Sequence, residues 1–221
     1  YFTSGGSEAN NQAILSVTEM MKNYGKRHNI SQITVLAILT LFYGAWFFRQ
    51  VTLCRRGVEG VRLGQGDKAP EVRCQERRLA AATLLLGIVQ YVVALTDNAL
   101  LAVCPTRAWM WVVGTVAGVV GIAYLVMALS AMQTNWRAGI DTARQTGLVQ
   151  SGIYRFSRNP VFVGFALMYC GVLLILPNYL LVVLTGVALV LCHRQIVCEE
   201  RYLAQRFGEE YEVYCRRTWR Y

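Results

Sequence analysis

Two short stretches in the last third of the chain carry residues able to bind a charged small molecule. Arg155 and Arg158 precede Asn159-Pro160, a pair suited to the start of a helix, where asparagine caps and proline is tolerated. Backbone N–H groups at such an end attract anions, and a nearby arginine suits a carboxylate or phosphate. Glu199 and Glu200 lie near the end of a later apolar segment, where they require a cationic partner. A zwitterionic amino acid group would fit between the two stretches.

The elements that position these residues are predicted from runs without Asp, Glu, Lys, Arg or His. The last run has 34 residues, about 51 Å as a helix, which exceeds a hydrocarbon core of about 30 Å. It must therefore fold back, and Pro177-Asn178 near its middle predicts a tight turn between antiparallel helices. The expected fold class is all-α, with five transmembrane helices of which the last two form a hairpin. The four runs are 29–48, 79–96, 108–136 and 159–192.

The composition agrees with a membrane protein. Apolar residues make up 55% of the chain and charged residues 16%, with a net charge of +9, whereas soluble domains carry about 25% charged residues. A basic excess can indicate nucleic-acid binding when it follows one groove or face. Here the charges fall between apolar runs, so we expect membrane lipids around the protein and no nucleic-acid partner.

The positions of the basic residues predict the orientation. Eight lie in 49–78, four in 132–160 and six in the tail from His193, whereas 97–107 has only Arg107. By the positive-inside rule the first three segments are cytosolic. Five spans then place the tail in the cytosol and the N-terminus outside, although three basic residues before the first span favour the opposite orientation: Lys22, Lys26 and Arg27.

Three separated motifs carry a family resemblance. Residues 151–164 read Ser-Gly-Ile-Tyr-Arg-Phe-Ser-Arg-Asn-Pro-Val-Phe-Val-Gly, and 199–214 follow Glu-Glu-x-x-Leu-x-x-x-Phe-Gly-x-x-Tyr-x-x-Tyr. Together with Trp-Arg-x-Gly-Ile-Asp at 136–141, they resemble the isoprenylcysteine carboxyl methyltransferase and phospholipid methyltransferase superfamily, particularly its prokaryotic members. The resemblance implies an integral membrane methyltransferase that binds S-adenosylmethionine between the last hairpin and a cytosolic C-terminal helix. It also implies a lipophilic or lipidated acceptor.

The same resemblance assigns site residues. It places Arg158 and Glu200 on the family's cofactor-pocket motifs, and the chemistry of the transfer, given below, makes these two the candidate catalytic residues. Many members have His where this chain has Asn159 and Tyr where it has Phe162. The first change is common among the phospholipid-type members and removes a titratable group, so the resemblance implies no histidine-dependent role here and argues less strongly for a prenylcysteine acceptor. The residues that fall on the family's cofactor motifs are Gly152, Tyr154, Arg155, Asn159, Pro160 and Glu199.

The chemistry leaves the acceptor open. A sulfonium methyl group is already activated, so its transfer depends mainly on alignment and desolvation. A carboxylate acceptor would be oriented by Arg158, Arg194 or Arg201, whereas an amine acceptor needs a carboxylate such as Glu200 to take a proton. Trp136 and Arg137 are either substrate-entry residues or interfacial anchors.

The remaining segments give a three-part organisation. Residues 1–29 are a polar segment, a possible fusion or remnant, expected to form an amphipathic helix over 7–24. Their first residues resemble a phosphate-binding turn, but we expect no cofactor there, because the chain has no room for the large domain that such a site needs. Residues 30–131 hold three transmembrane helices and the basic loop 49–78, and 132–221 form the catalytic region. Residues 199–214 predict an amphipathic cytosolic helix. The cysteines and His193 show no metal-ligand spacing, so no metal is expected.

Two other functions are weighed against methyl transfer. A membrane reductase related to the sterol reductases would bind NADPH, but those chains are much longer than this one. A non-catalytic membrane scaffold would keep the fold without the cofactor. Binding of S-adenosylhomocysteine, rather than of NADPH, would distinguish methyl transfer from these two functions.

Overall fold

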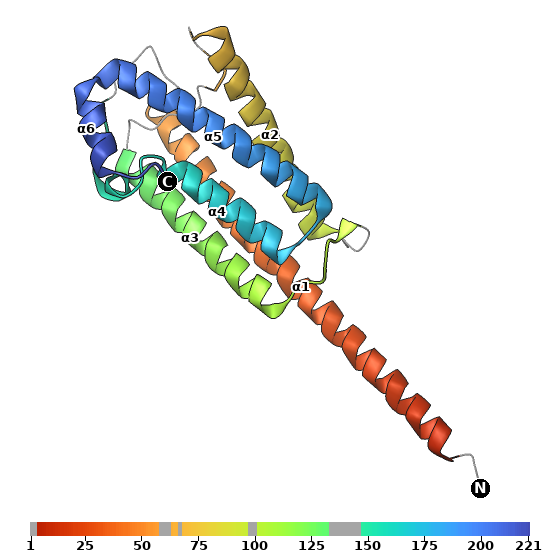
Figure 1. The fold of residues 1–221 in the computed structure, drawn as a ribbon. Helices are drawn as coiled ribbons and strands as arrows, with labels where there is room; N and C mark the ends of the chain where they lie inside the picture. The colour runs from red at the N-terminus through yellow and green to blue at the C-terminus, as the bar shows by residue number, and fades with distance from the viewer. Residues whose placement is uncertain (1–3, 58–62, 66–67, 97–100, 133–146) are drawn as a thin grey trace.

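The computed structural model describes residues 4–57, 63–65, 68–96, 101–132 and 147–221 and shows a helical bundle (Figure 1). Four helical segments are long and apolar enough to cross a membrane, and α4 is a shorter apolar helix of 16 residues. The five expected spans thus correspond to four long candidate spans and one short helix. The elements are α1 (Ser4–Arg55), α2 (Pro70–Leu95), α3 (Ala108–Met132), η3 (Gly152–Arg155), α4 (Pro160–Ile175), α5 (Tyr179–Phe207) and α6 (Glu209–Arg217).

The predicted hairpin in the last apolar run is confirmed. Helix α4 ends at Ile175 and α5 begins at Tyr179, so the turn includes Pro177 and Asn178. The Asn178 side chain accepts hydrogen bonds from the backbone N–H groups of Leu180 at 2.9 Å and Leu181 at 3.3 Å, which caps α5. The turn brings the start of α4 and the far end of α5 to the same end of the bundle.

The N-terminal part differs from the expected separate helix over 7–24. Helix α1 runs without a break from Ser4 to Arg55 (52 residues), and its N-terminal part projects beyond the other helices (Figure 1). The only residue in 20–35 that opposes a helix strongly is Gly25, and one glycine costs only about 1 kcal/mol relative to alanine. A polar segment and an apolar segment therefore share one continuous helix.

The C-terminal helix also differs from its expected bounds of 199–214. Helix α5 continues to Phe207, and the backbone turns at Gly208 (φ 52°) before α6 begins at Glu209. A positive φ is easily adopted by glycine, which has no Cβ. The amphipathic pattern therefore covers two helices, and the turn at Gly208 directs α6 back toward the bundle (Figure 1).

Glycines bring α3 and α4 into close antiparallel contact. A Cβ atom on Gly164 would lie 2.9 Å from the carbonyl oxygen of Gly121, and one on Gly171 would lie 2.6 Å from that of Gly114. The Gly114-x-x-x-Gly118 spacing on α3 is typical of close helix packing; the structure adds Gly121, and a Cβ on Gly118 would meet Ile38 of α1. Small residues at such positions allow backbones to approach in a membrane, where lipid is as apolar as the side chains.

This contact gives a stability prediction. Gly164→Val is expected to destabilise the protein by about 1–3 kcal/mol, because the new side chain meets backbone atoms that cannot rotate away. Thermal unfolding in detergent measures the effect. Gly186→Ala on α5 is the control, since a Cβ there meets nothing within 4 Å. Equal melting temperatures for Gly164→Val and the wild type would contradict the role of this contact.

Candidate active site

A cavity of about 470 Å³ lies where α1, α2, α4, α5 and α6 meet the loop before α4, a volume within the range of small-molecule sites. The wall formed by α1, α2 and the start of α4 is mostly apolar and includes Trp46, Leu79 and Phe165. Polar side chains reach the cavity from the loop and from α5 and α6, and we call them the polar wall: Arg158, Asn159, Gln195, Glu199, Tyr202, Tyr211 and Tyr214. The cavity therefore combines a lipophilic side with a charged side.

The loop before α4 is shaped by Gly152 and held by α6. Gly152 has φ 64°, a conformation that favours glycine, and opens the short helix η3. The side chain of Tyr154 lines the cavity, and its carbonyl oxygen accepts a hydrogen bond from the Tyr214 hydroxyl at 2.7 Å. Burial raises the pKa of Tyr214 to about 12, so this hydroxyl stays protonated at neutral pH and can donate.

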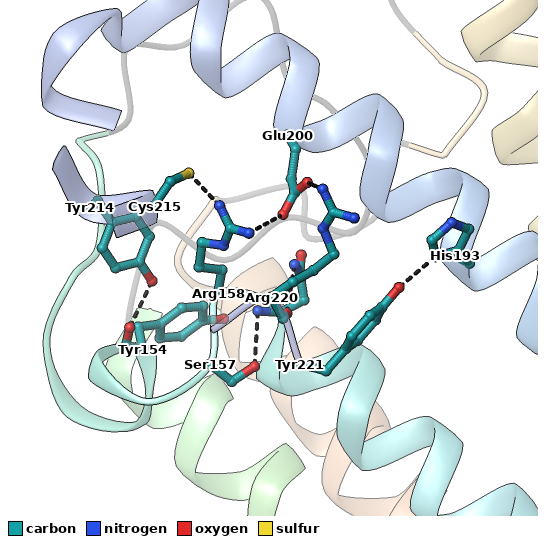
Figure 2. A network of polar contacts seen from close by, with 10 residues as sticks. Tyr154, Ser157, Arg158, His193, Glu200, Tyr214, Cys215, Arg220 and Tyr221 are labelled. Atoms are coloured by element: carbon teal, nitrogen blue, oxygen red, sulfur yellow. Dashed lines mark hydrogen bonds and ion pairs between the residues drawn. The ribbon is translucent and has the colours of Figure 1, made fainter. Parts of the chain in front are cut away.

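Arg158 is the cation of this polar wall and is contacted from two sides. Its Nη2 lies 3.4 Å from Oε1 of Glu200, and its Nη1 contacts Sγ of Cys215 (Figure 2). Nε of Arg158 is buried, and nothing in the described part of the chain accepts a hydrogen bond from it. A buried donor without an acceptor is costly, so this atom is a candidate to bind a ligand.

Glu199 and Glu200 are neighbours in sequence but have different surroundings. Glu199 lines the cavity, and its Oε1 accepts a hydrogen bond from Nε2 of Gln195 at 3.0 Å. Oε1 of Gln195 is buried without a hydrogen-bond donor among the described residues. Glu200 does not line the cavity and lies behind Arg158, which does. Glu199 can thus contact a cationic ligand group, whereas Glu200 acts through Arg158.

The C-terminal residues are joined to the loop before α4. The backbone N–H of Arg158 donates to the carbonyl oxygen of Trp219 at 2.8 Å, and Nδ2 of Asn159 donates to that of Arg220 at 3.1 Å. Arg220 also places Nη2 2.8 Å from Oε2 of Glu200, on the side opposite Arg158 (Figure 2). The hydrogen bond and charge of Glu200 raise the pKa of Arg220. Tyr221 contacts His193 of α5.

The structure brings together four of the residues assigned to the site from sequence: Tyr154, Arg158, Asn159 and Glu199 line one cavity. Gly152 and Pro160 do not line it; they shape the loop and begin α4. The Asn159 side chain binds the tail instead of capping α4. Arg155, Arg194 and Arg201 are exposed and lie outside the cavity lining. Trp136 and Arg137 fall outside the described residues.

Sequence reasoning missed the tail and the apolar wall. Arg220 and Trp219 follow the last motif and have no helical periodicity, so no local pattern indicates their contacts with the loop. Tyr214 belongs to a quoted motif, but its hydrogen bond spans 60 residues. Tyr43, Thr83 and Leu84 lie on apolar helices, where hydropathy alone does not separate cavity-lining from lipid-facing side chains.

The fold and the cavity thus define a helical membrane protein with a small-molecule site that is charged on one side and apolar on the other. Comparison with known proteins agrees on its class. Residues 109–210 match the phospholipid methyltransferase family. Probable protein-S-isoprenylcysteine O-methyltransferases from Oryza sativa, subspecies indica and japonica, are each 33% identical over 155 residues, covering 64% of this chain and 80% of theirs.

A third relative matches over a shorter region. The protein-S-isoprenylcysteine O-methyltransferase of Schizosaccharomyces pombe is 37% identical over 68 residues, 30% of this chain and 29% of its own length. No solved structure matches the chain. The chain belongs to the isoprenylcysteine carboxyl methyltransferase and phospholipid methyltransferase superfamily, and it is a membrane methyltransferase.

Proposed function

We propose that this protein transfers a methyl group from S-adenosylmethionine to the carboxylate of an isoprenylated cysteine at the cytosolic side of a membrane. The observation that carries the proposal is that Arg158 and Glu199 line the same cavity as the apolar wall of α1 and α2. The acceptor is taken from the names of the relatives from rice and fission yeast. The basic segments of the chain support the cytosolic side.

The residues of the polar wall fit the cofactor. Its amino acid group is zwitterionic, so its carboxylate suits Arg158 and its ammonium suits Glu199. The unsatisfied Nε of Arg158 and Oε1 of Gln195 are further polar atoms that a bound ligand would satisfy. When bound, S-adenosylmethionine supplies an activated methyl group, and the chain's own residues need to orient both ligands and exclude water.

The apolar wall fits an isoprenoid tail. Leu84 of α2 lines the cavity and is 67% exposed, so the cavity opens on a helix that is apolar enough to lie in lipid. A tail that enters here remains in contact with apolar groups throughout, which avoids about 0.8 kcal/mol for each methylene group kept from water. The tail can thus stay among apolar groups while the cysteine carboxylate reaches the polar wall.

Ligand titration tests the proposed function. Detergent-purified protein is titrated with S-adenosylhomocysteine and, separately, with NADPH, and products are then analysed after incubation with an isoprenylated cysteine and with an amine-bearing lipid. We expect binding of S-adenosylhomocysteine but not NADPH, and a methyl ester as product. Failure to bind S-adenosylhomocysteine in any detergent or lipid would refute methyl transfer, and methylation of the amine lipid alone would refute the carboxylate acceptor.

A substitution at the opening separates acceptor entry from cofactor binding. Leu84→Trp is expected to raise the KM of the isoprenylated acceptor about tenfold, because apolar pockets discriminate by about 1–3 kcal/mol for small changes in fit, while S-adenosylhomocysteine affinity stays unchanged. Steady-state kinetics and titration measure the two effects. Leu85→Trp is the matched control, since Leu85 is exposed on the same helix but is not part of the cavity lining. Equal KM values for the two variants would place the entrance elsewhere.

A further inference from the structure

We propose that Arg220 is a positioning residue of the active site, which holds Glu200 so that Arg158 remains free to bind an anionic ligand group in the cavity. This inference rests on the proposed function, because it concerns the anion that Arg158 binds. Arg220 lies in the C-terminal tail and does not line the cavity. Its effect on the ligand is therefore transmitted by Glu200 and Arg158.

The first step is the geometry of Glu200. Its Oε2 lies 2.8 Å from Nη2 of Arg220, whereas its Oε1 lies 3.4 Å from Nη2 of Arg158 (Figure 2). The side chains of Glu200 and Arg158 are 11% and 13% exposed, whereas that of Arg220 is 43% exposed, so the Arg220 contact is made at the edge of the site and is partly screened by water. By distance, the carboxylate is bound closely by the tail arginine and only loosely by the cavity arginine.

The second step is the competition between the two arginines. A carboxylate and a guanidinium prefer a two-bond arrangement that uses both oxygens. Arg220 takes one of the acceptor sites of Oε2 and so opposes that arrangement between Glu200 and Arg158. Without Arg220, both oxygens are available to Arg158, and the pair would neutralise and immobilise the guanidinium that should face the ligand.

The third step is that the tail is held independently of this ion pair. The carbonyl oxygens of Trp219 and Arg220 accept hydrogen bonds from Arg158 N and Asn159 Nδ2, and Oγ1 of Thr218 donates to the carbonyl oxygen of Arg155 at 3.4 Å. None of these bonds uses the Arg220 side chain. A substitution of that side chain therefore leaves the tail attached and changes mainly the charge beside Glu200.

The inference is tested with a double-mutant cycle in the full chain. Arg220→Gln is expected to weaken S-adenosylhomocysteine binding about tenfold, within the range of couplings in one ion-pair network. Arg220→Lys should restore most of the affinity because it keeps a cation beside Oε2. The double variant Glu200→Gln/Arg220→Gln should bind more tightly than Arg220→Gln alone, because a neutral amide no longer competes for Arg158.

Arg216→Gln is the matched control, since the Arg216 side chain is 79% exposed and pairs with Glu212 at the surface. If Arg220 only stabilised the tail, Arg220→Gln would lower the melting temperature and the double variant would bind no better; that result overturns the inference. Wild-type affinity in Arg220→Gln overturns it as well and leaves the proposed function intact. Absence of binding by the wild type overturns both.

Discussion

Replacing Arg158 with alanine is expected to lower kcat/KM for methyl transfer by about a hundredfold or more, because removing one partner of a buried, hydrogen-bonded charge pair with a ligand costs about 2–5 kcal/mol. Arg158 is the cation that the loop before α4 contributes to the cavity, and its side chain is 13% exposed. Its loss removes the group that binds the ligand carboxylate and also leaves Glu200 with Arg220 alone. Steady-state kinetics and S-adenosylhomocysteine titration measure the effect.

Two further variants separate binding from folding. Arg158→Lys keeps the charge but loses the planar donor pair, so it should remain at least about tenfold impaired. Arg217→Ala, in the exposed last turn of α6, should behave as the wild type. If Arg158→Ala melts with the wild type and binds S-adenosylhomocysteine equally well, the assignment of the anion site to Arg158 is wrong.

Replacing Glu199 with glutamine is expected to weaken S-adenosylhomocysteine binding about ten- to a hundredfold, because a hydrogen bond to a charged group contributes about 1.5–3 kcal/mol. Glu199 is the carboxylate that lines the cavity, and Gln195 already binds one of its oxygens. Glutamine keeps the size of the side chain but loses the charge that attracts an ammonium group. Isothermal titration calorimetry measures the affinity directly.

The control for Glu199 is Glu209→Gln, on the exposed start of α6, which should not change the affinity. The adjacent Glu200 provides a second comparison. Because Glu200 contacts Arg158 and does not line the cavity, Glu200→Gln should change how Arg158 binds the ligand carboxylate. A ligand analogue without the ammonium group keeps that carboxylate, so its affinity should respond to Glu200→Gln but not to Glu199→Gln. Equal sensitivity of that analogue to both substitutions would contradict the two roles.

The parts of the fold that depend on local chemistry could be predicted from the sequence. A run too long for one span required a turn, and Pro177-Asn178 near the middle of the run marked the place. Glycine spacing indicated close packing on α3, but its partners Gly164 and Gly171 became visible only in the bundle. The continuous α1 was not predicted, because a change from polar to apolar residues does not end a helix unless a residue breaks its hydrogen bonds.

The site was predictable to the extent that it lies in contiguous motifs. Arg158, Asn159 and Glu199 come from two such motifs and meet in one cavity. The roles of Glu199 and Glu200 could not be separated, because adjacent helical residues point in directions about 100° apart and the sequence does not say which faces the cavity. Arg220 lies in a tail that has no helical periodicity, so no pattern in the sequence indicates its contact with Glu200 of α5. Only the folded chain reveals this contact.

The length of α4 has a consequence for how this site can vary. One turn joins the end of α4, which has 16 residues, to the start of α5, which has 29. The number of residues in α4 therefore decides which residue of α5 the loop with Arg158 meets, and that residue is Glu200. One inserted residue would shift this loop by about 1.5 Å and rotate it by about 100°, carrying Arg158 away from Glu200. Insertions in α4 should thus be far less tolerated than substitutions on its lipid-facing side, although both leave the motifs themselves unchanged.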